Sequence, residues 1–373
     1  MLRVVVDENM PAVEAFLGEG ISVSRCNGRL LTSQALQKAD VLFVRSVTRV
    51  DDALLAGTPV HFVGTATSGT EHVDTQYLSS QGIGFSRAAG SNANSVVEYV
   101  LSTLVACPPH LENLMSGGSV GVIGQGPVGL AVAQRLRALG GVCHVYDPWL
   151  PQEQLEGHAS LEQVLACDLV CLHPELTHRE PWPSYHLLGA RELQGMSGHQ
   201  LLINASRGAV VDNRALRKRL EEAHPPQVVL DVWEGEPDLD TVLLDRVTLG
   251  TAHIAGYSLD GKVLATQMLC EAMAKALEIS LPVSAAPVNA PRYRAGGGRQ
   301  GAALVGQLLG QCYDIREDDR RLRSACHSGE AVAAAFDHLR KHYRERRELA
   351  GNIVADCDPS QRDIVRALGC IPG

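Results

Sequence analysis

The sequence predicts an α/β protein with a doubly wound parallel sheet, preceded by another α/β unit and followed by a smaller segment. Three observations support this class. Short apolar runs alternate with helical stretches through most of the 373 residues, which is typical of parallel strands joined by crossover helices. A glycine-rich loop follows one of these runs and opens a helix. A chain of this length also exceeds one ordinary core, so we expect two or three domains.

The composition narrows the class of function. A formal net charge of −9 argues against a protein that binds nucleic acid or a membrane surface, because phosphate-rich partners require a basic face. An anionic small molecule remains possible, since it needs only a local cluster of Arg and Lys. No apolar run is long enough to cross a bilayer, and residues 4–8 (three valines, then two acids) resemble a buried strand more than a signal peptide. We therefore expect a cytoplasmic protein.

The ten cysteines are scattered without the spacing of a disulfide framework or a metal site. Cys167 and Cys171 come closest to a pair, but they flank an apolar strand. We interpret them as buried small side chains in preference to ligands, and we predict no metal site.

The first unit covers residues 1–93. We predict strands at 4–6, 41–44 and 60–63, separated by helical segments such as 11–17. A helix at about 259–279 is expected to cross back to this unit, which therefore also takes in about residues 257–282.

The second unit, residues 94–256, is expected to form the doubly wound sheet. Ser95 and Glu98 have the spacing of a capping box before an apolar helix at 96–105. Six predicted strands follow, at residues 120–123, 142–146, 169–172, 201–204, 228–230 and 247–249.

The last 91 residues, 283–373, form a separate predicted domain. Residues 281–287, and the stretch on to 298, are rich in Pro, Gly and Arg and indicate a linker. Beyond it lies an amphipathic helix with Val332, Phe336, Leu339 and Tyr343 on one face. So short a domain builds only a marginal core, so we expect homodimerisation through it. A cap docked on its own chain is the alternative.

The glycine-rich loop predicts a dinucleotide site. Gly124, Gly126 and Gly129 form G-x-G-x-x-G between a strand and a helix. Gly124 permits the tight turn, Gly126 lets a pyrophosphate approach the backbone, and Gly129 permits close helix–strand packing. The helix N-terminus offers free N–H groups to phosphates, and Pro127 suits its first turn.

Asp147, at the end of the next strand, predicts NAD as the cofactor. Its carboxylate would accept hydrogen bonds from ribose hydroxyls and repel the 2′-phosphate of NADP. No Arg or Lys occurs between Asp147 and Arg179 to offset that repulsion. An ordinary turn after the strand is the alternative interpretation of Asp147.

Candidate catalytic groups follow three consecutive strands. Arg207, Glu236 and His253 lie just beyond predicted strand ends, and Asp231 closes one strand. Because ligands bind beyond the carboxyl ends of parallel strands, these groups are expected to meet. A histidine, with an unperturbed pKa of about 6.5, can take the hydroxyl proton of a 2-hydroxy acid while hydride leaves the same carbon.

The remaining groups support that base. Glu236 would orient the ring of His253, Arg207 would bind the substrate carboxylate through a bidentate fork, and Asp231 would contact the nicotinamide end of the cofactor. A single histidine after a strand is usually structural, so the prediction for His253 depends on Arg207 and Glu236 at neighbouring strand ends. The sequence places no such groups with His61, His72, His173 and His199, which are interpreted as structural or exposed.

Four motifs carry a resemblance to a known family. The sequence resembles the D-isomer-specific 2-hydroxyacid dehydrogenases at VIGQGPVG (122–129), NASRG (204–208), DVWEGEP (231–237) and HIAG (253–256). Within that family it is most similar to the branch that oxidises 4-phospho-D-erythronate and carries an extra C-terminal domain, at VDENMP (6–11), RSVT (45–48) and HIAGYS (253–258), with GK at 261–262.

The resemblance implies oxidation of 4-phospho-D-erythronate to 2-oxo-3-hydroxy-4-phosphobutanoate with NAD, a step of pyridoxal 5′-phosphate (vitamin B6) synthesis. It implies a flavodoxin-like first unit that acts as a lid, and a terminal α+β dimerisation domain. It assigns catalysis to Arg207, Glu236 and His253, and substrate binding to Ser46, Thr67 and Tyr257. For the cofactor, the resemblance implies contacts from Asp147, Asp231 and Gly256. With the glycine-rich loop and Ser206, the predicted cofactor-binding residues are Gly124, Gln125, Gly126, Val128, Gly129, Asp147, Ser206, Asp231 and Gly256. The family usually has a Thr-Pro pair after the histidine of the fourth strand, whereas this chain has His173-Pro174-Glu175-Leu176. The path of that loop and its nucleotide contact are therefore not carried over.

Arg45, beside Ser46, is our candidate for binding the substrate phosphate, and a surface arginine is the alternative. Two other functions stay open: a dehydrogenase for another 2-hydroxy acid such as 3-phosphoglycerate or glycerate, and a non-catalytic NAD-sensing regulator on the same fold.

Overall fold

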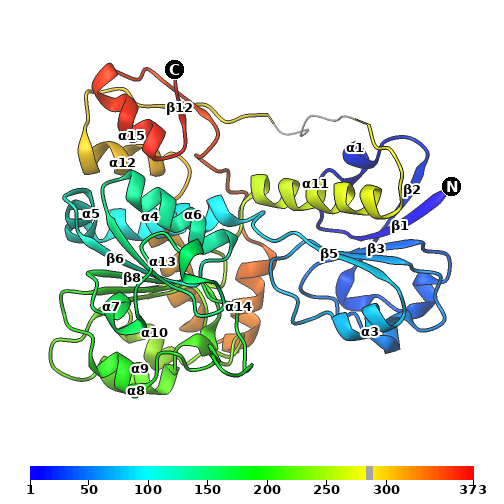
Figure 1. Cartoon of the computed structure of the whole chain (residues 1–373), viewed down its shortest axis with the longest axis horizontal. Coiled ribbons are helices and arrows are strands. Elements are labelled where there is room, and N and C mark those ends of the chain that lie inside the picture. The colour runs from blue at the N-terminus through cyan, green and yellow to red at the C-terminus, as the bar shows by residue number, and fades with distance from the viewer. Residues whose placement is uncertain (283–288) are drawn as a thin grey trace. The chain divides into compact units, whose positions relative to one another are not determined.

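The computed structural model describes residues 1–282 and 289–373 and divides into two compact units. One unit combines Met1–Asn92 with Ser258–Ala290, and the other combines Ala93–Tyr257 with Pro291–Gly373. Figure 1 traces the chain through both. The centre of the predicted linker, residues 283–288, lies outside the described residues.

The first unit holds a five-stranded parallel sheet in the order β2-β1-β3-β4-β5, which is the flavodoxin-like order. Its strands are β1 (Leu2–Asp7), β2 (Ile21–Cys26), β3 (Val41–Val44), β4 (Phe62–Thr65) and β5 (Gly84–Arg87). The prediction missed β2 and β5. Both are edge strands that are only partly buried, so neither has the apolar run that marks a central strand.

Helices cover both faces of this sheet, as a parallel sheet requires. They are α1 (Val13–Leu17), α2 (Asp52–Leu55), α3 (Thr75–Ser80) and α11 (Leu259–Ala276). Val4 and Val6 pack on the side of α1 and α11, whereas Val5 packs on the side of α2 and α3. The helix predicted at 259–279 therefore joins the core of the first unit.

The second unit holds a six-stranded parallel sheet in the order β11-β10-β9-β8-β6-β7. Its strands are β6 (Ser119–Ile123), β7 (Val142–Tyr146), β8 (Leu169–Leu172), β9 (Leu201–Asn204), β10 (Gln227–Leu230) and β11 (Leu249–Gly250). Five of the six predicted strands are present with similar bounds, whereas the sixth, predicted at 247–249, begins only at Leu249 because Val247 is the C-cap of helix α10 (Thr241–Arg246). The chain proceeds from β6 to β7 on one side and from β8 to β11 on the other, so the switch point where such sheets bind ligands lies between β6 and β8.

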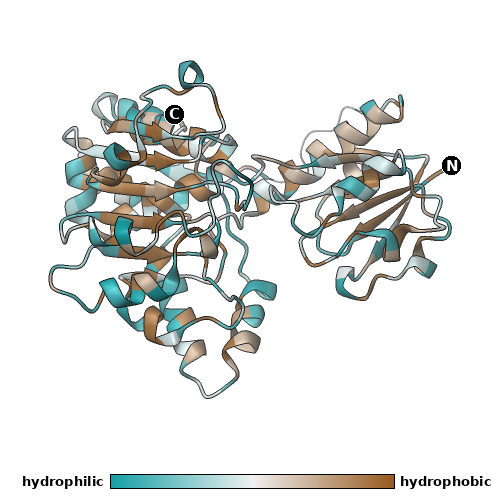
Figure 2. Ribbon diagram, turned by 60° about the horizontal axis from the view of Figure 1, so that its bottom comes forward, coloured by the Kyte–Doolittle hydropathy of each residue, from teal (hydrophilic) through white to brown (hydrophobic). Residues whose placement is uncertain are grey.

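Two hydrophobic cores sandwich this sheet, and the strands are largely brown in the hydropathy view of Figure 2. The core on one face includes α4 (Ala93–Ala106), α5 (Pro108–Met115) and α6 (Pro127–Ala138). The core on the other face includes α7 (Leu161–Leu165), α8 (Ala190–Gln194), α9 (Asn213–Arg219) and α10 (Thr241–Arg246). Neighbouring residues alternate between the two cores, as Leu201 and Leu202 do.

The predicted capping box is wrong. Helix α4 begins at Ala93, so Ser95 and Glu98 both lie inside it. The Ser95 hydroxyl donates to the carbonyl of Ala255 (2.9 Å), and Glu98 is buried. Tertiary partners have taken the two side chains whose spacing suggested a local cap.

The C-terminal segment is α+β, as predicted. It contains a three-stranded parallel sheet, β12 (Tyr293–Arg294), β13 (Ile353–Ala355) and β14 (Ile371–Pro372), with helices α12 (Gly301–Leu309), α13 (Ile315–Cys326), α14 (Val332–Lys341) and α15 (Arg362–Ala367). This segment shares both hydrophobic cores of the nucleotide sheet. A boundary that makes it a separate domain stays a prediction.

Helix α14 bears out most of the predicted amphipathic face. Phe336 is fully buried in one core, and Val332 and Leu339 pack against it. Tyr343 lies beyond the end of the helix and packs against the other core, so its place on this face was wrong. No helix in the described part of the chain is both long and apolar enough to span a membrane.

Candidate active site

The glycine-rich loop lies at the switch point, between β6 and α6. Gly124 has a positive φ of 89°, and an added Cβ would lie 2.6 Å from the nitrogen of Pro174. A Cβ on Gly129 would lie 1.8 Å from the carbonyl oxygen of Gly124. Around Gly126, by contrast, no atom of the described chain lies within 4 Å of such a Cβ. The fold itself requires the first and third glycines, whereas the second leaves open space at the start of α6.

That open space adjoins a helix N-terminus and a fixed carboxylate. Gly126 is the N-cap of α6 and Pro127 its first residue, with no side chain capping the free N–H groups. Asp147 accepts from the nitrogen of Gln125 (2.8 Å) and from that of Trp149 (3.0 Å). The acid at the end of β7 is thus held beside the loop.

The structure adds a cation to this region. Arg179 stacks over the ring of Trp149 at 4.0 Å from its centroid, although the two are 30 positions apart (179 − 149) in the sequence. Residues 148–178 contain no Arg or Lys, but folding brings Arg179 against Trp149, two positions after Asp147. The absence of cations from that stretch of sequence therefore does not by itself exclude NADP.

His253 and Glu236 meet in the structure. A hydrogen bond joins His253 Nδ1 and Glu236 Oε1, and the other carboxylate oxygen accepts from the nitrogen of Trp233 (3.1 Å). Burial raises the pKa of the Glu236 carboxyl, but the hydrogen bond and the charge of His253 lower it by more. The pKa of Glu236 is therefore below its ordinary value. Glu236 is therefore an anion near neutral pH.

Asp231 brackets the backbone around His253. Its carboxylate accepts from the hydroxyl of Thr251 (2.7 Å) and from the nitrogens of Ile254 (2.8 Å) and Ala255 (2.9 Å), while its carbonyl accepts from the nitrogen of His253 (2.7 Å). Burial raises the pKa of this carboxyl above its ordinary value, although the same partners oppose the rise. Asp231 is 1% exposed, and its contact with nicotinamide stays a prediction.

Arg207 lies on the loop after β9, next to the strand that carries Asp231. Asn204 shapes this loop by accepting from the nitrogen and hydroxyl of Ser206 (3.1 and 2.8 Å) and donating to the carbonyl of Arg207 (3.0 Å). A Cβ on Gly208 would lie 2.0 Å from the carbonyl carbon of Trp233. The loops that carry Arg207 and Glu236 are therefore packed directly together.

Strand register explains why these loops meet. Asn204 pairs with Leu230, and Leu230 pairs with Gly250, so β9, β10 and β11 end at one level of the sheet. The sequence predicted this from the strand ends alone.

The substrate residues implied by the resemblance fall in both units. In the second unit, the Tyr257 hydroxyl accepts from Arg340 Nη2 (3.3 Å), and Gly256, which the resemblance assigns to the nucleotide, is partly exposed. In the first unit, Ser46 is exposed, and Thr67 Oγ1 lies 2.8 Å from Thr65 Oγ1. These roles stay predictions.

Arg45 is less available than the sequence suggested. Its Nη1 lies 3.9 Å from Asp7 Oδ1, and Asp7 is 1% exposed. Part of the arginine's charge is therefore balanced within its own unit.

The four histidines that the sequence analysis set aside have structural or exposed settings. His61 and His199 are exposed, and His72 Nε2 lies 2.8 Å from Thr65 Oγ1. His173 is partly buried beside the position of a Gly129 Cβ with both ring nitrogens enclosed, and burial lowers its pKa to about 4. Neither of its ring nitrogens has a hydrogen-bond partner among the described residues.

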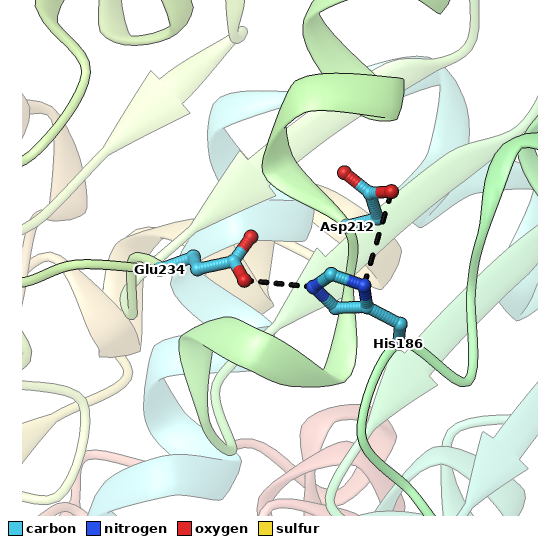
Figure 3. Close-up of side chains that lie close together, drawn as sticks. All are labelled: His186, Asp212 and Glu234. Carbon is cyan, nitrogen blue, oxygen red and sulfur yellow. Dashed lines mark hydrogen bonds and ion pairs between the residues drawn. The ribbon is translucent and has the colours of Figure 1, made fainter.

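Sequence reasoning missed His186, which Figure 3 shows between two carboxylates. Its Nε2 lies 2.7 Å from Glu234 Oε1, and its Nδ1 lies 3.9 Å from Asp212 Oδ2. The three ligand atoms of this cluster lie within 4.8 Å of one another, but the acids face different ring nitrogens and an ion binds only one. Glu234 also exchanges hydrogen bonds with Asn213 (3.2 and 3.1 Å), so we interpret the cluster as a brace for the loop that carries Glu236.

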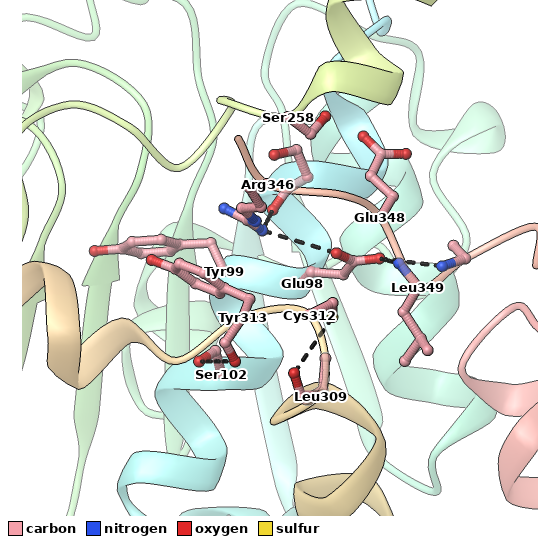
Figure 4. Close-up of polar contacts among 12 residues, drawn as sticks. Glu98, Tyr99, Ser102, Ser258, Leu309, Cys312, Tyr313, Arg346, Glu348 and Leu349 are labelled. Atoms are coloured by element: carbon pink, nitrogen blue, oxygen red, sulfur yellow. Dashed lines mark hydrogen bonds and ion pairs between the residues drawn. The ribbon is translucent and has the colours of Figure 1, made fainter. Parts of the chain in front are cut away.

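A buried ionic network, also missed, ties the C-terminal segment to α4 (Figure 4). Glu98 accepts from the nitrogens of Leu349 (2.6 Å) and Ala350 (3.1 Å), and Arg346 Nη2 lies 3.9 Å from its other oxygen. Arg346 also donates to the carbonyls of Ser95 (2.7 Å) and Ala255 (3.4 Å). The charged run around Arg346 resembles a solvated surface in the sequence, so no local pattern could have revealed this role.

Comparison with known proteins adds two family models. Residues 106–255 match the model described as "D-isomer specific 2-hydroxyacid dehydrogenase, NAD binding domain". Residues 289–369 match a domain of unknown function.

Two curated relatives span nearly the whole chain. An erythronate-4-phosphate dehydrogenase from Cellvibrio japonicus is 45% identical over 93% of both chains. One from Pseudomonas aeruginosa is 42% identical over 99% of both.

Solved structures share the fold at lower identity. A glyoxylate/hydroxypyruvate reductase from Sinorhizobium meliloti matches with a TM-score of 0.63 at 20% identity, over 76% of this chain and 97% of that one. A D-lactate dehydrogenase from Aquifex aeolicus matches with a TM-score of 0.57 at 20% identity, over 74% and 95%.

Proposed function

The chain belongs to the erythronate-4-phosphate dehydrogenases of the D-isomer-specific 2-hydroxyacid dehydrogenase family, and we propose that it oxidises 4-phospho-D-erythronate with NAD. The product is 2-oxo-3-hydroxy-4-phosphobutanoate, within vitamin B6 synthesis. The observation that carries the proposal is 45% identity over 93% of the chain, together with a His253–Glu236 pair beyond neighbouring strands.

The glycine-rich loop fits the pyrophosphate of NAD. The space beside Gly126 adjoins uncapped N–H groups of α6, which favour an anion. Asp147 is held where a ribose would follow the pyrophosphate. Bound NAD would accept the hydride that leaves C2 of the substrate. The residues assigned to holding it are Gly124, Gln125, Gly126, Val128, Gly129, Asp147, Ser206, Asp231 and Gly256.

His253 takes the hydroxyl proton. Its Nδ1 is engaged with Glu236, and because Glu236 is an anion, Nδ1 carries the hydrogen. Nε2 is then the ring nitrogen with a lone pair to accept the substrate's proton. Glu236 stabilises the imidazolium that forms.

Arg207 binds the substrate carboxylate and polarises the developing carbonyl. Ser46, Thr67, Tyr257 and Arg45 supply further contacts to the substrate. The family relationship supports the first three of these assignments, and Arg45 rests on its place beside Ser46.

The C-terminal segment is assigned to homodimerisation. Ile353 and Ile371 are paired neighbours on β13 and β14 and are 59% and 54% exposed, and a second copy would cover them. A cytoplasmic location agrees with free cysteines throughout the described chain.

The test is NADH absorbance with purified protein, NAD and 4-phospho-D-erythronate, with and without 2-oxoglutarate. Continuous turnover, or a rise of one equivalent that the oxo acid releases, supports the proposal. D-3-Phosphoglycerate is the comparison substrate. Turnover with phosphoglycerate alone would keep the catalytic assignments and discard the substrate, and NAD binding without any turnover would favour a regulator.

A further inference from the structure

The C-terminal segment reaches the loop that follows His253. Tyr343 packs edge-on against Tyr257, with ring centroids 5.7 Å apart. Arg346 donates to the carbonyl of Ala255, and Arg340 Nη2 donates to the hydroxyl of Tyr257. Three side chains of this segment therefore contact Ala255 and Tyr257, two and four positions after the catalytic histidine.

Arg340 is partly buried, and it differs in its partners from four other arginines of this segment. Arg316, Arg321, Arg323 and Arg344 each form an ion pair with a carboxylate within 4.0 Å. No carboxylate of the described chain lies within that distance of Arg340. Its Nε is buried with no hydrogen-bond partner among the described residues.

The guanidinium lies against the hydroxyl of Tyr257. Burial lowers the pKa of Arg340, but Tyr257 and Glu236 outweigh it and raise the pKa above its ordinary value. Arg340 in turn is one of the groups that lower the pKa of the Glu236 carboxyl. Arg340 has a hydrogen bond to Tyr257 and lies over the ring of Phe336 at 5.9 Å from its centroid, but its charge is not paired with a carboxylate, so an anion bound here would be stabilised. Such an anion can come from the substrate.

We propose that Arg340, together with the hydroxyl of Tyr257, binds the phosphate of the substrate, so that the C-terminal segment completes the active site of its own chain. The inference rests on the proposed function. The substrate has two anions, and Arg207 is assigned to the carboxylate beside the reacting carbon. The phosphate, two carbons further on, requires another cation, and Arg45 already shares its charge with Asp7.

The test compares Arg340→Gln, Arg340→Lys and wild type on 4-phospho-D-erythronate and on unphosphorylated D-erythronate. Lys341→Ala is the matched control, because it removes an exposed cation from the adjoining position of α14. We expect kcat/KM of Arg340→Gln to fall about 10- to 100-fold on the phosphorylated substrate and to change little on D-erythronate. Arg340→Lys should recover part of the loss, since it restores the charge without the fork.

An equal loss on both substrates would overturn the proposal and assign Arg340 to the support of Tyr257. Binding separates this failure from a failure of the proposed function. Calorimetric titration of each protein with 4-phospho-D-erythronate in the presence of NADH needs no turnover. Weaker binding by Arg340→Gln but not by Lys341→Ala supports the proposal even if wild type oxidises neither compound, whereas equal binding, or none to wild type, rejects it.

Discussion

His253 occupies a backbone conformation that few side chains adopt. Its φ is 54°, in the left-handed region that is costly for residues other than glycine. Hydrogen bonds from residues 253, 254 and 255 to Asp231 hold the backbone there. The carbonyl and carboxylate of Asp231 therefore hold this conformation, in which the ring is hydrogen-bonded to Glu236.

The hydrogen bond between Glu236 and His253 yields a prediction at this scale. Glu236→Gln removes the anion that fixes the ring and stabilises the imidazolium, so we expect kcat to fall about 100- to 10,000-fold. NAD affinity, measured by fluorescence titration, should change little. Asp238→Asn, an exposed acid two positions away, is the control, and an equal loss in that variant would contradict the assignment.

Two glycines of one loop should respond in opposite ways. Gly126→Ala meets open space, so we expect an unchanged melting temperature but NAD affinity weakened at least about tenfold, because the methyl group occupies the path of the pyrophosphate. Gly129→Ala collides with the carbonyl of Gly124 and should lower stability by about 1–3 kcal/mol. Thermal melts and NAD titrations of both variants decide the matter, and a Gly126→Ala protein with normal affinity would contradict the loop's role.

At the scale of elements, the buried carboxyl group of Glu98 joins helix α4 to residues 346–350 of the C-terminal segment. Glu98 is fully enclosed, and burial raises its pKa to about 7 although Arg346 and the nitrogens of Leu349 and Ala350 oppose the rise. A buried ion pair is weak evidence for stability by itself. What this one does is hold residues 346–350 against the helix.

The raised pKa predicts a direction for stability against pH. The folded state binds the Glu98 proton more tightly than the unfolded state, whose reference pKa is 4.5. The stabilisation that comes from this tighter proton binding by Glu98 is thus complete below pH 4.5 and is lost as pH rises through about 7. Glu98→Gln cannot ionise, so we expect its free energy of unfolding to fall about 1–3 kcal/mol less than that of wild type between pH 5 and pH 8.

Denaturant unfolding at both pH values measures this difference. Glu112→Gln, an exposed position on α5, controls for the loss of one carboxylate. Identical pH dependence in wild type and Glu98→Gln would show that Glu98 does not titrate in this range.

At the scale of the whole molecule, we predict that two copies assemble through the small sheet β12-β13-β14. Ile353 and Ile371 expose adjacent apolar side chains, which favours a partner surface. We expect Ile353→Glu with Ile371→Glu to convert a dimer to a monomer, because two charges cannot be buried without partners. Light scattering after size-exclusion chromatography gives the mass. A wild-type mass near 40.0 kDa would favour the docked cap instead, and a dimer that persists in the double variant would place the interface elsewhere.

Much of the candidate active site could be predicted from the sequence, because its residues lie at strand ends. Each buried strand can be recognised from its own apolar run, and the carboxyl ends of parallel strands lie on the same side of a sheet. Glu236 and His253 were therefore expected to meet, and they do. The edge strands β2 and β5 escaped, since partial burial leaves no such run.

The sequence by itself determined the α/β class, the glycine-rich loop and the residues at the strand ends, because these depend on local periodicity and on steric limits of single residues. Only the tertiary structure decided the partners of Ser95, Glu98, Arg340 and Arg346. Each is a polar side chain whose local pattern suggests a cap or a solvated surface, and each has its main contacts with residues distant in the sequence. Burial and charge pairing of that kind depend on which segments fold together, and no stretch of sequence contains that information.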